Sequence, residues 1–238
     1  MAELSARERI ILAIDTSDTT EAERLAKLAA DAGAKYVKLG LELSSATGWA
    51  YCANLAMNHG LGWVADAKLH DIDNTVAQTV RNIRSKSLKP FGITMHTTAD
   101  IPAMQKAQEA AEDTKMLGVT VLTSVNEESC RRIYGKGRME KVAELAIDAS
   151  HANLAGLVCS PLEVGMVTST EETSGLFTMI PGSRSSGAAH HDQANVDTPA
   201  ATIMNGANLL VIGRQITQAD NPAFAFEKLV AEIEGAMK

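Results

Sequence analysis

The chain reads Asp66-Ala67-Lys68-Leu69-His70-Asp71-Ile72-Asp73-Asn74-Thr75 immediately after the apolar residues Trp63-Val64-Ala65. These apolar residues predict a buried strand over Trp63–Lys68, and because side chains alternate along a strand, Asp66 and Lys68 point to the same face. Asp71 lies in the turn that follows. A lysine held between two carboxylates keeps its proton. The pattern therefore favours Lys68 as a proton donor or electrostatic clamp, and not as a Schiff-base nucleophile, which needs a lowered pKa.

Strand-like apolar runs recur along the chain and alternate with stretches of helical periodicity. The runs predict eight strands, over Ile10–Ile14, Tyr36–Leu39, Trp63–Lys68, Gly92–His96, Met116–Leu122, Gly156–Cys159, Phe177–Ile180 and Leu209–Ile212. The stretches between them predict helices over Glu21–Ala32, Val76–Ser85, Pro102–Ala111, Lys141–Ala152, Thr198–Asn205 and Pro222–Met237. This alternation favours one (β/α)₈ TIM barrel, an α/β fold that occupies residues 1–238 as a single domain. A doubly wound open sheet is the structural alternative, because periodicity alone does not decide closure.

The composition is that of an ordinary globular protein and restricts its partners. The 238 residues are 45% hydrophobic and carry a formal net charge of −7, with no block of Lys and Arg. A nucleic-acid partner is therefore not expected, and an anionic ligand needs a local basic site. The widely spaced Cys52, Cys130 and Cys159 predict reduced core thiols in a cytoplasmic protein. No apolar run reaches the roughly 18 residues of a membrane span, so neither membrane insertion nor secretion is expected.

Polar or charged residues gather where the predicted strands end. In a parallel barrel the active site is built from loops at the carboxyl ends of the strands, and phosphate is often held after strands seven and eight. The residues at these ends are Asp15, Lys38, Asp66, Lys68, His96, Thr123-Ser124, Pro181-Gly182-Ser183-Arg184 and Gly213-Arg214. Gly213-Arg214, together with Arg184 and Gln193, predicts an anion site, because glycine lets an anion approach the backbone and arginine supplies forked donors.

Several of these residues also have simpler interpretations. Asp71, Asp73 and Asn74 are short acceptors that can cap the helix predicted to follow them. Asp66 and Lys68 can form a structural ion pair, Lys38 can extend to the surface, and Arg184 can be a solvated loop residue. His190-His191-Asp192 is typical of an exposed polar loop, and no metal site is predicted there. His70 and His96 are ambiguous, because His70 lies inside the charged stretch and can orient a carboxylate.

The pattern Asp66-x-Lys68-x-x-Asp71-Ile72-x-Asn74-Thr75 resembles the orotidine 5′-phosphate decarboxylase family. The likeness extends from Ile14-Asp15 to Thr217 and includes Leu122-Thr123-Ser124, Ile180-Pro181-Gly182-x-Arg184, Asp192-Gln193 and Val211-Ile212-Gly213-Arg214-x-Ile216-Thr217. The resemblance implies a (β/α)₈ homodimer that converts orotidine 5′-monophosphate to UMP in pyrimidine biosynthesis, with no metal or organic cofactor. It implies that Lys68 stabilises and protonates the carbanion at C6 of the pyrimidine.

The same resemblance implies roles for the other site residues. Asp15 and Lys38 would contact the ribose, and Lys38 would complete a Lys-Asp-Lys-Asp array with Asp66, Lys68 and Asp71. Asp71 and Thr75 would reach into the site of the neighbouring subunit. Thr123 and Ser124 would meet the pyrimidine. The phosphate would be bound by Arg184, Gln193, Gly213 and Arg214.

Departures from the family pattern leave two other functions open. Asp73 stands where the family commonly has proline, Ser183 and Ser185 flank Arg184, and Asn195 replaces a common arginine. One alternative is an Mg²⁺-dependent sugar-phosphate decarboxylase or aldolase of the same barrel type, such as 3-keto-gulonate-phosphate decarboxylase or hexulose-phosphate synthase. The other is a catalytically silent protein that binds nucleotide phosphates.

Overall fold

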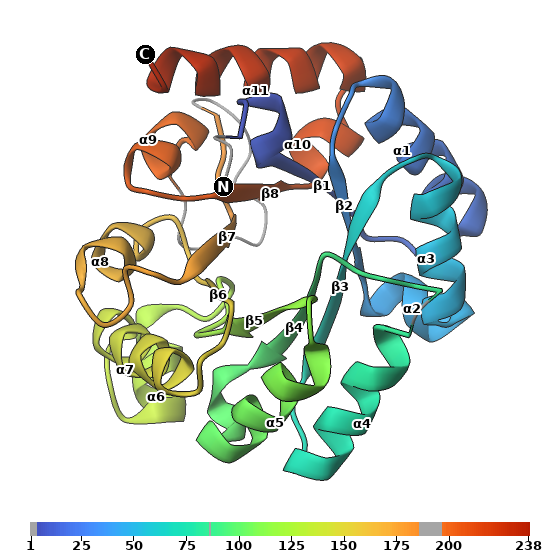
Figure 1. Ribbon diagram of the computed structural model, residues 1–238. Helices are drawn as coiled ribbons and strands as arrows, with labels where there is room; N and C mark the ends of the chain where they lie inside the picture. Colours follow the sequence, from blue (N-terminus) through green and yellow to red (C-terminus); the bar gives the residue numbers. More distant parts are fainter. Residues whose placement is uncertain (1–3, 86, 186–196) are drawn as a thin grey trace.

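Eight parallel strands form a closed barrel in the computed structural model, which describes residues 4–85, 87–185 and 197–238 (Figure 1). The strands are β1 (Ile10–Ile14), β2 (Tyr36–Gly40), β3 (Gly62–Leu69), β4 (Gly92–His96), β5 (Lys115–Val119), β6 (Gly156–Val158), β7 (Phe177–Pro181) and β8 (Leu209–Ile212). The last strand returns to the first, with Leu210 in register with Ile10. This closure confirms the predicted TIM barrel and excludes the doubly wound alternative.

Helices surround the barrel on the outside (Figure 1). They are α1 (Thr19–Asp31), α2 (Leu41–Thr47), α3 (Trp49–Asn58), α4 (Asp73–Ile83), α5 (Ile101–Ala111), α6 (Glu127–Tyr134), α7 (Arg138–His151), α8 (Val164–Ser169), α9 (Pro199–Met204), α10 (Arg214–Thr217) and α11 (Pro222–Ala236), with short 3₁₀ turns η1 (Arg7–Arg9) and η2 (Thr97–Ala99). None of the helices in the described ranges has the length and apolar character that crossing a membrane requires.

Two apolar cores follow from the alternation of side chains along the strands. On β1, Ile10, Leu12 and Ile14 face outward and pack with the helices, whereas Ile11 and Ala13 face the barrel interior. The interior core is completed by Val64, Leu117, Met179, Leu209 and Val211. The interior is therefore packed, and a ligand has room only beyond the strand ends.

The predicted strand over Met116–Leu122 is too long, because β5 ends at Val119. Both the backbone N–H and the hydroxyl of Thr120 donate to the Val158 carbonyl, at 3.1 Å each, and the chain then turns away. Helices α2, α3, α6, α8 and α10 were not predicted. They lie in connections where the apolar periodicity is short or interrupted.

Candidate active site

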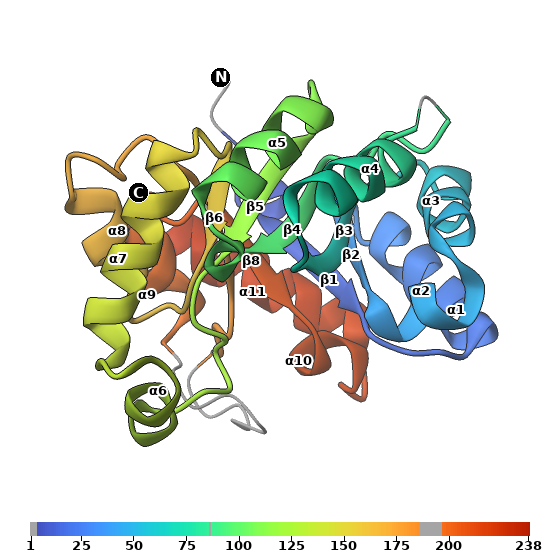
Figure 2. The ribbon, with the colours of Figure 1, turned by 90° about the horizontal axis from the view of Figure 1, so that it is seen from below.

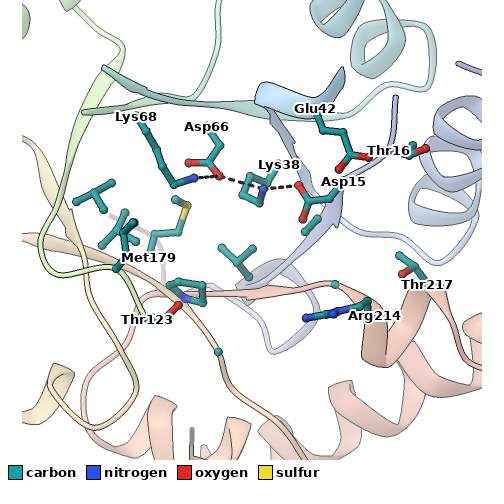
Figure 3. Close-up of a pocket in the computed structure, with 18 of the residues that line it drawn as sticks. Asp15, Thr16, Lys38, Glu42, Asp66, Lys68, Thr123, Met179, Arg214 and Thr217 are labelled. Carbon is teal, nitrogen blue, oxygen red and sulfur yellow. Dashed lines mark hydrogen bonds and ion pairs between the residues drawn. The ribbon is translucent and has the colours of Figure 1, made fainter. Parts of the chain in front are cut away.

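A cavity of about 630 Å³ opens at the carboxyl ends of the strands (Figure 3). Helices α6 and α10, which follow β5 and β8, lie on this side of the barrel (Figure 2). Eight predicted site residues line the cavity: Asp15, Lys38, Asp66, Lys68, Thr123, Arg184, Gly213 and Arg214. Residues up to about 200 positions apart are thus brought together by the register of the closed barrel.

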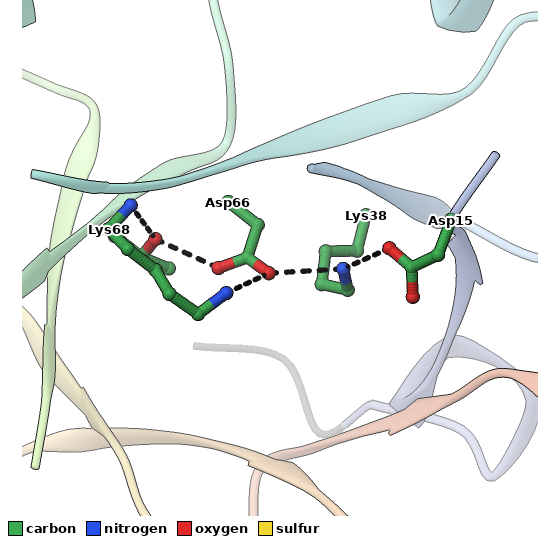
Figure 4. A network of polar contacts seen from close by, with 5 residues as sticks. Asp15, Lys38, Asp66 and Lys68 are labelled. Carbon is green, nitrogen blue, oxygen red and sulfur yellow. Dashed lines mark hydrogen bonds and ion pairs between the residues drawn. The ribbon is translucent and has the colours of Figure 1, made fainter. Parts of the chain in front are cut away.

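Four of these residues alternate in charge and form what is called here the charged row, Asp15-Lys38-Asp66-Lys68 (Figure 4). Lys38 Nζ lies 2.8 Å from Asp15 Oδ1 and 3.0 Å from Asp66 Oδ2. Lys68 Nζ lies 2.7 Å from the same Asp66 oxygen, which confirms that Asp66 and Lys68 share a face. Each carboxylate therefore has a cation beside it, and Lys68 ends the row inside the cavity.

The backbone at Lys68 is unusual. Its φ of 45° lies in the left-handed region, which a side chain such as lysine rarely adopts, and the pairing of β3 with β4 shifts register between Ala65 and Leu69. The buried Thr94 on β4 compensates for the lost strand pairing. Its hydroxyl accepts the Lys68 N–H at 2.9 Å and donates to Asp66 Oδ1 at 2.9 Å. Thr94 was not singled out from the sequence, where its only signal is a polar residue inside an apolar strand.

Electrostatics keep the buried members of the row charged. Burial by itself would lower the pKa of Lys38, but the neighbouring charges of Asp66 and Asp15 more than reverse this, so that the pKa lies above its usual value. Burial would likewise raise the pKa of Asp66, and the charges of Lys38 and Lys68 outweigh it, so that the pKa lies below its usual value. At neutral pH Lys38 is therefore an ammonium ion and Asp66 a carboxylate.

Two arginines that line the cavity follow β7 and β8: Arg184 lies in the loop after β7, and Arg214 is the first residue of α10. Arg184 is only 8% exposed, and its Nη1 donates to the Ser183 carbonyl at 2.8 Å, while its buried Nε has no hydrogen-bond partner among the described residues. Burial and the nearby charge of Arg214 lower the pKa of Arg184. Gly182, with φ of 93°, makes the turn that brings Arg184 into the cavity. An anionic group would satisfy both the unpaired donor and the two neighbouring positive charges.

The remaining predicted site residues lie elsewhere. Asp71 and Thr75 are exposed and do not line the cavity of their own chain. Ser124 is also exposed and outside the lining, whereas its neighbour Thr123 lies within it. Gln193 lies outside the described residues, as do Asp192, Asn195 and the pair His190-His191. The roles assigned to all of these side chains stay predictions.

The capping interpretation holds in part for Asp73. Ile72 occupies the N-cap position of α4, and its side chain makes no cap hydrogen bond. Asp73 is the first helical residue; its Oδ1 accepts the backbone N–H of Asn74 at 2.7 Å, which is one of the free amides of the first turn, and its Oδ2 forms an ion pair with Lys106 at 2.6 Å. His70 and His96 lie side by side, with ring centroids 5.7 Å apart, and burial together with the charges of His70 and Lys68 lowers the pKa of His96.

Residues that the sequence pattern did not indicate complete the cavity. Most of them are apolar or neutral side chains, such as Thr16, Val121, Cys159, Met179 and Gln218, and the carboxylates of Glu21 and Glu42 also line the cavity. The three cysteines are free and buried, as predicted, and burial raises the pKa of the Cys52 thiol to about 11. The cavity thus pairs a charged side with an apolar wall from β5, β6 and β7.

Comparison with known proteins agrees with this architecture. The chain is 38% identical to an orotidine 5′-phosphate decarboxylase of Methylobacterium over 98% of both sequences, and 41% identical to one of Synechococcus over 92% of both. The crystal structure of orotidine 5′-phosphate decarboxylase from Lactobacillus acidophilus superimposes with a TM-score of 0.81 at 26% identity, over 95% of this chain and 99% of that one. Residues 8–229 match the family model described as orotidine 5′-phosphate decarboxylase / HUMPS, and the chain belongs to this family.

Proposed function

We propose that this protein decarboxylates orotidine 5′-monophosphate to UMP in pyrimidine biosynthesis. The observation that carries the proposal is that a single cavity is lined by the charged row, which ends in Lys68 on β3, and by Arg184 and Arg214, which follow β7 and β8. A nucleotide can span these two groups, with its phosphate at the arginines and its base beside Lys68. The names of the relatives, which are orotidine 5′-phosphate decarboxylases, support the same reaction.

The reaction requires positive charge at one carbon of the base. Loss of CO₂ breaks the bond between C6 and the carboxylate and leaves the electron pair on C6, in the plane of the ring and without an adjacent electron sink. A lysine ammonium can stabilise this carbanion and then transfer its proton to C6, which yields UMP. We assign both tasks to Lys68, whose side chain is one-third exposed to the cavity.

The magnitude of this assistance can be estimated. A pair of unit charges about 3 Å apart interacts by roughly 5 kcal/mol at an effective dielectric constant near 20. This corresponds to about four decades of rate. The remaining acceleration would come from binding the phosphate and ribose, which fixes the base against Lys68 and excludes water.

Asp66 has two roles in this proposal. It lies 2.7 Å from Lys68 Nζ and thereby holds the ammonium group directed into the cavity. A carboxylate in this position would also repel the carboxylate of the substrate and favour its departure. Asp15 and Lys38 would hold the ribose, because Lys38 has hydrogen-bonding capacity beyond Asp15 and Asp66 and both side chains line the cavity.

We further propose a homodimer in which Asp71 and Thr75 enter the site of the partner subunit. Both residues are exposed on their own chain, and Ile72 between them is 70% exposed. An exposed apolar side chain of this size is typical of a surface that packs against another protein. The reduced, buried thiols support a cytoplasmic location.

The Mg²⁺-dependent sugar-phosphate reaction is less well supported. Both oxygens of Asp66 already accept hydrogen bonds from protein groups, Oδ1 from Thr94 and Oδ2 from two lysines. These contacts favour a role for Asp66 in positioning the two lysines over a role as a ligand of Mg²⁺.

The decisive experiment is a spectrophotometric assay of the purified protein with orotidine 5′-monophosphate, with and without EDTA. Turnover that EDTA leaves unchanged is the expected result. No turnover of orotidine 5′-monophosphate, together with turnover of a sugar phosphate that EDTA abolishes, would favour the sugar-phosphate alternative. UMP binding without any turnover would instead indicate a silent nucleotide-binding protein.

A further inference from the structure

A buried ion pair that does not touch the cavity joins two of the loops that form it. Arg138 is the first residue of α7, and Glu163 directly precedes α8, on one flank of the barrel (Figure 1). Their side chains are 6% and 3% exposed, and Arg138 Nη2 lies 2.8 Å from Glu163 Oε1. Because a buried ion pair contributes little net stability, the pair needs an explanation other than folding.

The hydrogen bonds of Arg138 fix the loop between β5 and α6. Its Nη1 donates to the Leu122 carbonyl at 2.9 Å and also to the Val125 carbonyl. These two carbonyls flank Thr123 and Ser124, the residues expected to meet the pyrimidine. One guanidinium thus binds the backbone on both sides of the segment that carries Thr123 into the cavity.

Glu163 fixes the neighbouring loop, between β6 and α8. Its Oε2 accepts the backbone N–H of Ser160 at 2.8 Å, while Oε1 accepts Nε and Nη2 of Arg138 at 3.1 and 2.8 Å. Ser160 follows Cys159, which lines the cavity. The pair therefore connects two adjacent stretches of the same cavity wall, at Leu122-Thr123 and at Val158-Cys159.

We propose that Arg138 and Glu163 are positioning residues that set the nucleobase side of the cavity. This inference rests on the proposed function, because it takes the wall at Thr123 to be the one that meets the pyrimidine. The phosphate side is built separately, from Arg184 in the loop after β7 and Arg214 at the start of α10, and the pair makes no hydrogen bond to either of those two residues. The pair consequently acts on recognition of the base and not on recognition of the phosphate.

Arginine is required at position 138 because of its geometry. The planar guanidinium presents forked donors that reach two carbonyls on one edge and a carboxylate on the other. A lysine keeps the charge opposite Glu163, but its single nitrogen cannot make all of these contacts. Arg138→Lys therefore separates the role of the charge from that of the backbone hydrogen bonds.

The test compares ligands that differ only in the base. Calorimetry gives the Kd of UMP and of ribose 5-phosphate for the wild type, Arg138→Lys and the double variant Arg138→Met/Glu163→Met, and kcat and KM are measured with orotidine 5′-monophosphate. The double variant removes both charges, so that neither is left buried without a partner. Arg84→Lys is the matched control, because Arg84 also donates to a carbonyl, that of Ala110, and pairs with Glu112, but outside the cavity.

The expected result is a rise of about tenfold in the Kd of UMP and in KM for both test variants, as for the loss of one or two charge-assisted hydrogen bonds. The Kd of ribose 5-phosphate should change by less than about twofold, and the Arg84→Lys control should leave both ligands unaffected. Circular dichroism and thermal melting show which variants are folded. If Arg138→Lys does not fold, the double variant decides.

An equal loss of affinity for UMP and ribose 5-phosphate, or an unchanged UMP affinity in folded variants, would overturn the inference. The proposed function fails separately, through a wild type that does not decarboxylate orotidine 5′-monophosphate. The ratio of the two affinities can still be measured in that case. It would then judge the positioning role without reference to turnover.

Discussion

Lys68 Nζ lies 2.7 Å from Asp66 Oδ2, an oxygen that it shares with Lys38. The shared oxygen makes Asp66 the electrostatic centre of the charged row, with a cation on either side. The ammonium group of Lys38 forms ion pairs with both Asp66 and Asp15. Lys68, at the end of the row, forms an ion pair with Asp66. Both lysines line the cavity, but Lys68 is the more exposed and is therefore the one placed to act on a ligand.

Replacing Lys68 by alanine should abolish turnover and leave UMP binding measurable. The substitution removes the charge and the proton that the carbanion requires, and a loss of at least about four decades in kcat is expected. The measurement is single-turnover decarboxylation together with calorimetric titration of UMP. Lys27→Ala is the control, because Lys27 is 66% exposed in a surface pair with Asp31 and should behave as wild type. Activity near that of the wild type in Lys68→Ala would refute the assignment.

Replacing Thr94 by valine should lower kcat by about tenfold, with a smaller change in the affinity for UMP. The nearly isosteric side chain leaves the Lys68 N–H and Asp66 Oδ1 without their common partner, and an unpaired buried polar group costs about 1–3 kcal/mol. Thr94→Ser keeps the hydroxyl and should recover most of the rate. Equal kcat values for the valine and serine variants would show that the hydroxyl does not position Lys68.

The strands were predictable because apolar runs and their spacing are local properties of the chain. The polar residues at strand ends could be found for the same reason, since Asp15 and Arg214 follow such runs and Lys38 lies near the end of one. The alternation of eight strands with helices favoured a closed barrel, but periodicity alone could not decide closure, because closure depends on the pairing of β8 with β1 across the whole chain. The end of β5 was also missed, since the apolar character continues beyond Val119 while the hydrogen bonds of Thr120 turn the chain away.

Contacts between distant elements could not be predicted either, because they depend on how the elements pack and not on the local sequence. Thr94 and Lys68 are 26 residues apart, and their hydrogen bond exists because β3 shifts register where Lys68 adopts a positive φ. Arg138 and Glu163 are 25 residues apart and lie at the starts of two helices. Nothing in the local pattern of either residue distinguishes it from a solvent-exposed charge.

The stability of the protein should fall in acid partly through Asp66. Its pKa is lowered in the folded state, because the charges of Lys38 and Lys68 outweigh burial, so folding favours the carboxylate. Such a group stabilises the fold above its unfolded pKa, near 4, and this contribution is lost as the pH falls through the folded value, at about 1.4 kcal/mol for each unit of depression. Urea unfolding from pH 7 to pH 3 should show a smaller acid loss in Asp66→Asn than in the wild type. An equal loss of unfolding free energy between pH 7 and pH 3 in Asp66→Asn and in the wild type would contradict the prediction.

Mixing two inactive variants should restore activity if Asp71 serves the partner subunit. Lys68→Ala and Asp71→Ala each disable every site of their own homodimers. In a hybrid dimer, one site carries both substitutions and the other carries neither, because its Lys68 comes from one chain and its Asp71 from the other. Random reassociation makes half of the dimers hybrid, so about one quarter of the wild-type activity is expected. The mixture is assayed after mild denaturation and refolding, beside each variant treated alone. If Asp71 acted within its own chain, both sites of the hybrid would lack one group and the mixture would stay inactive.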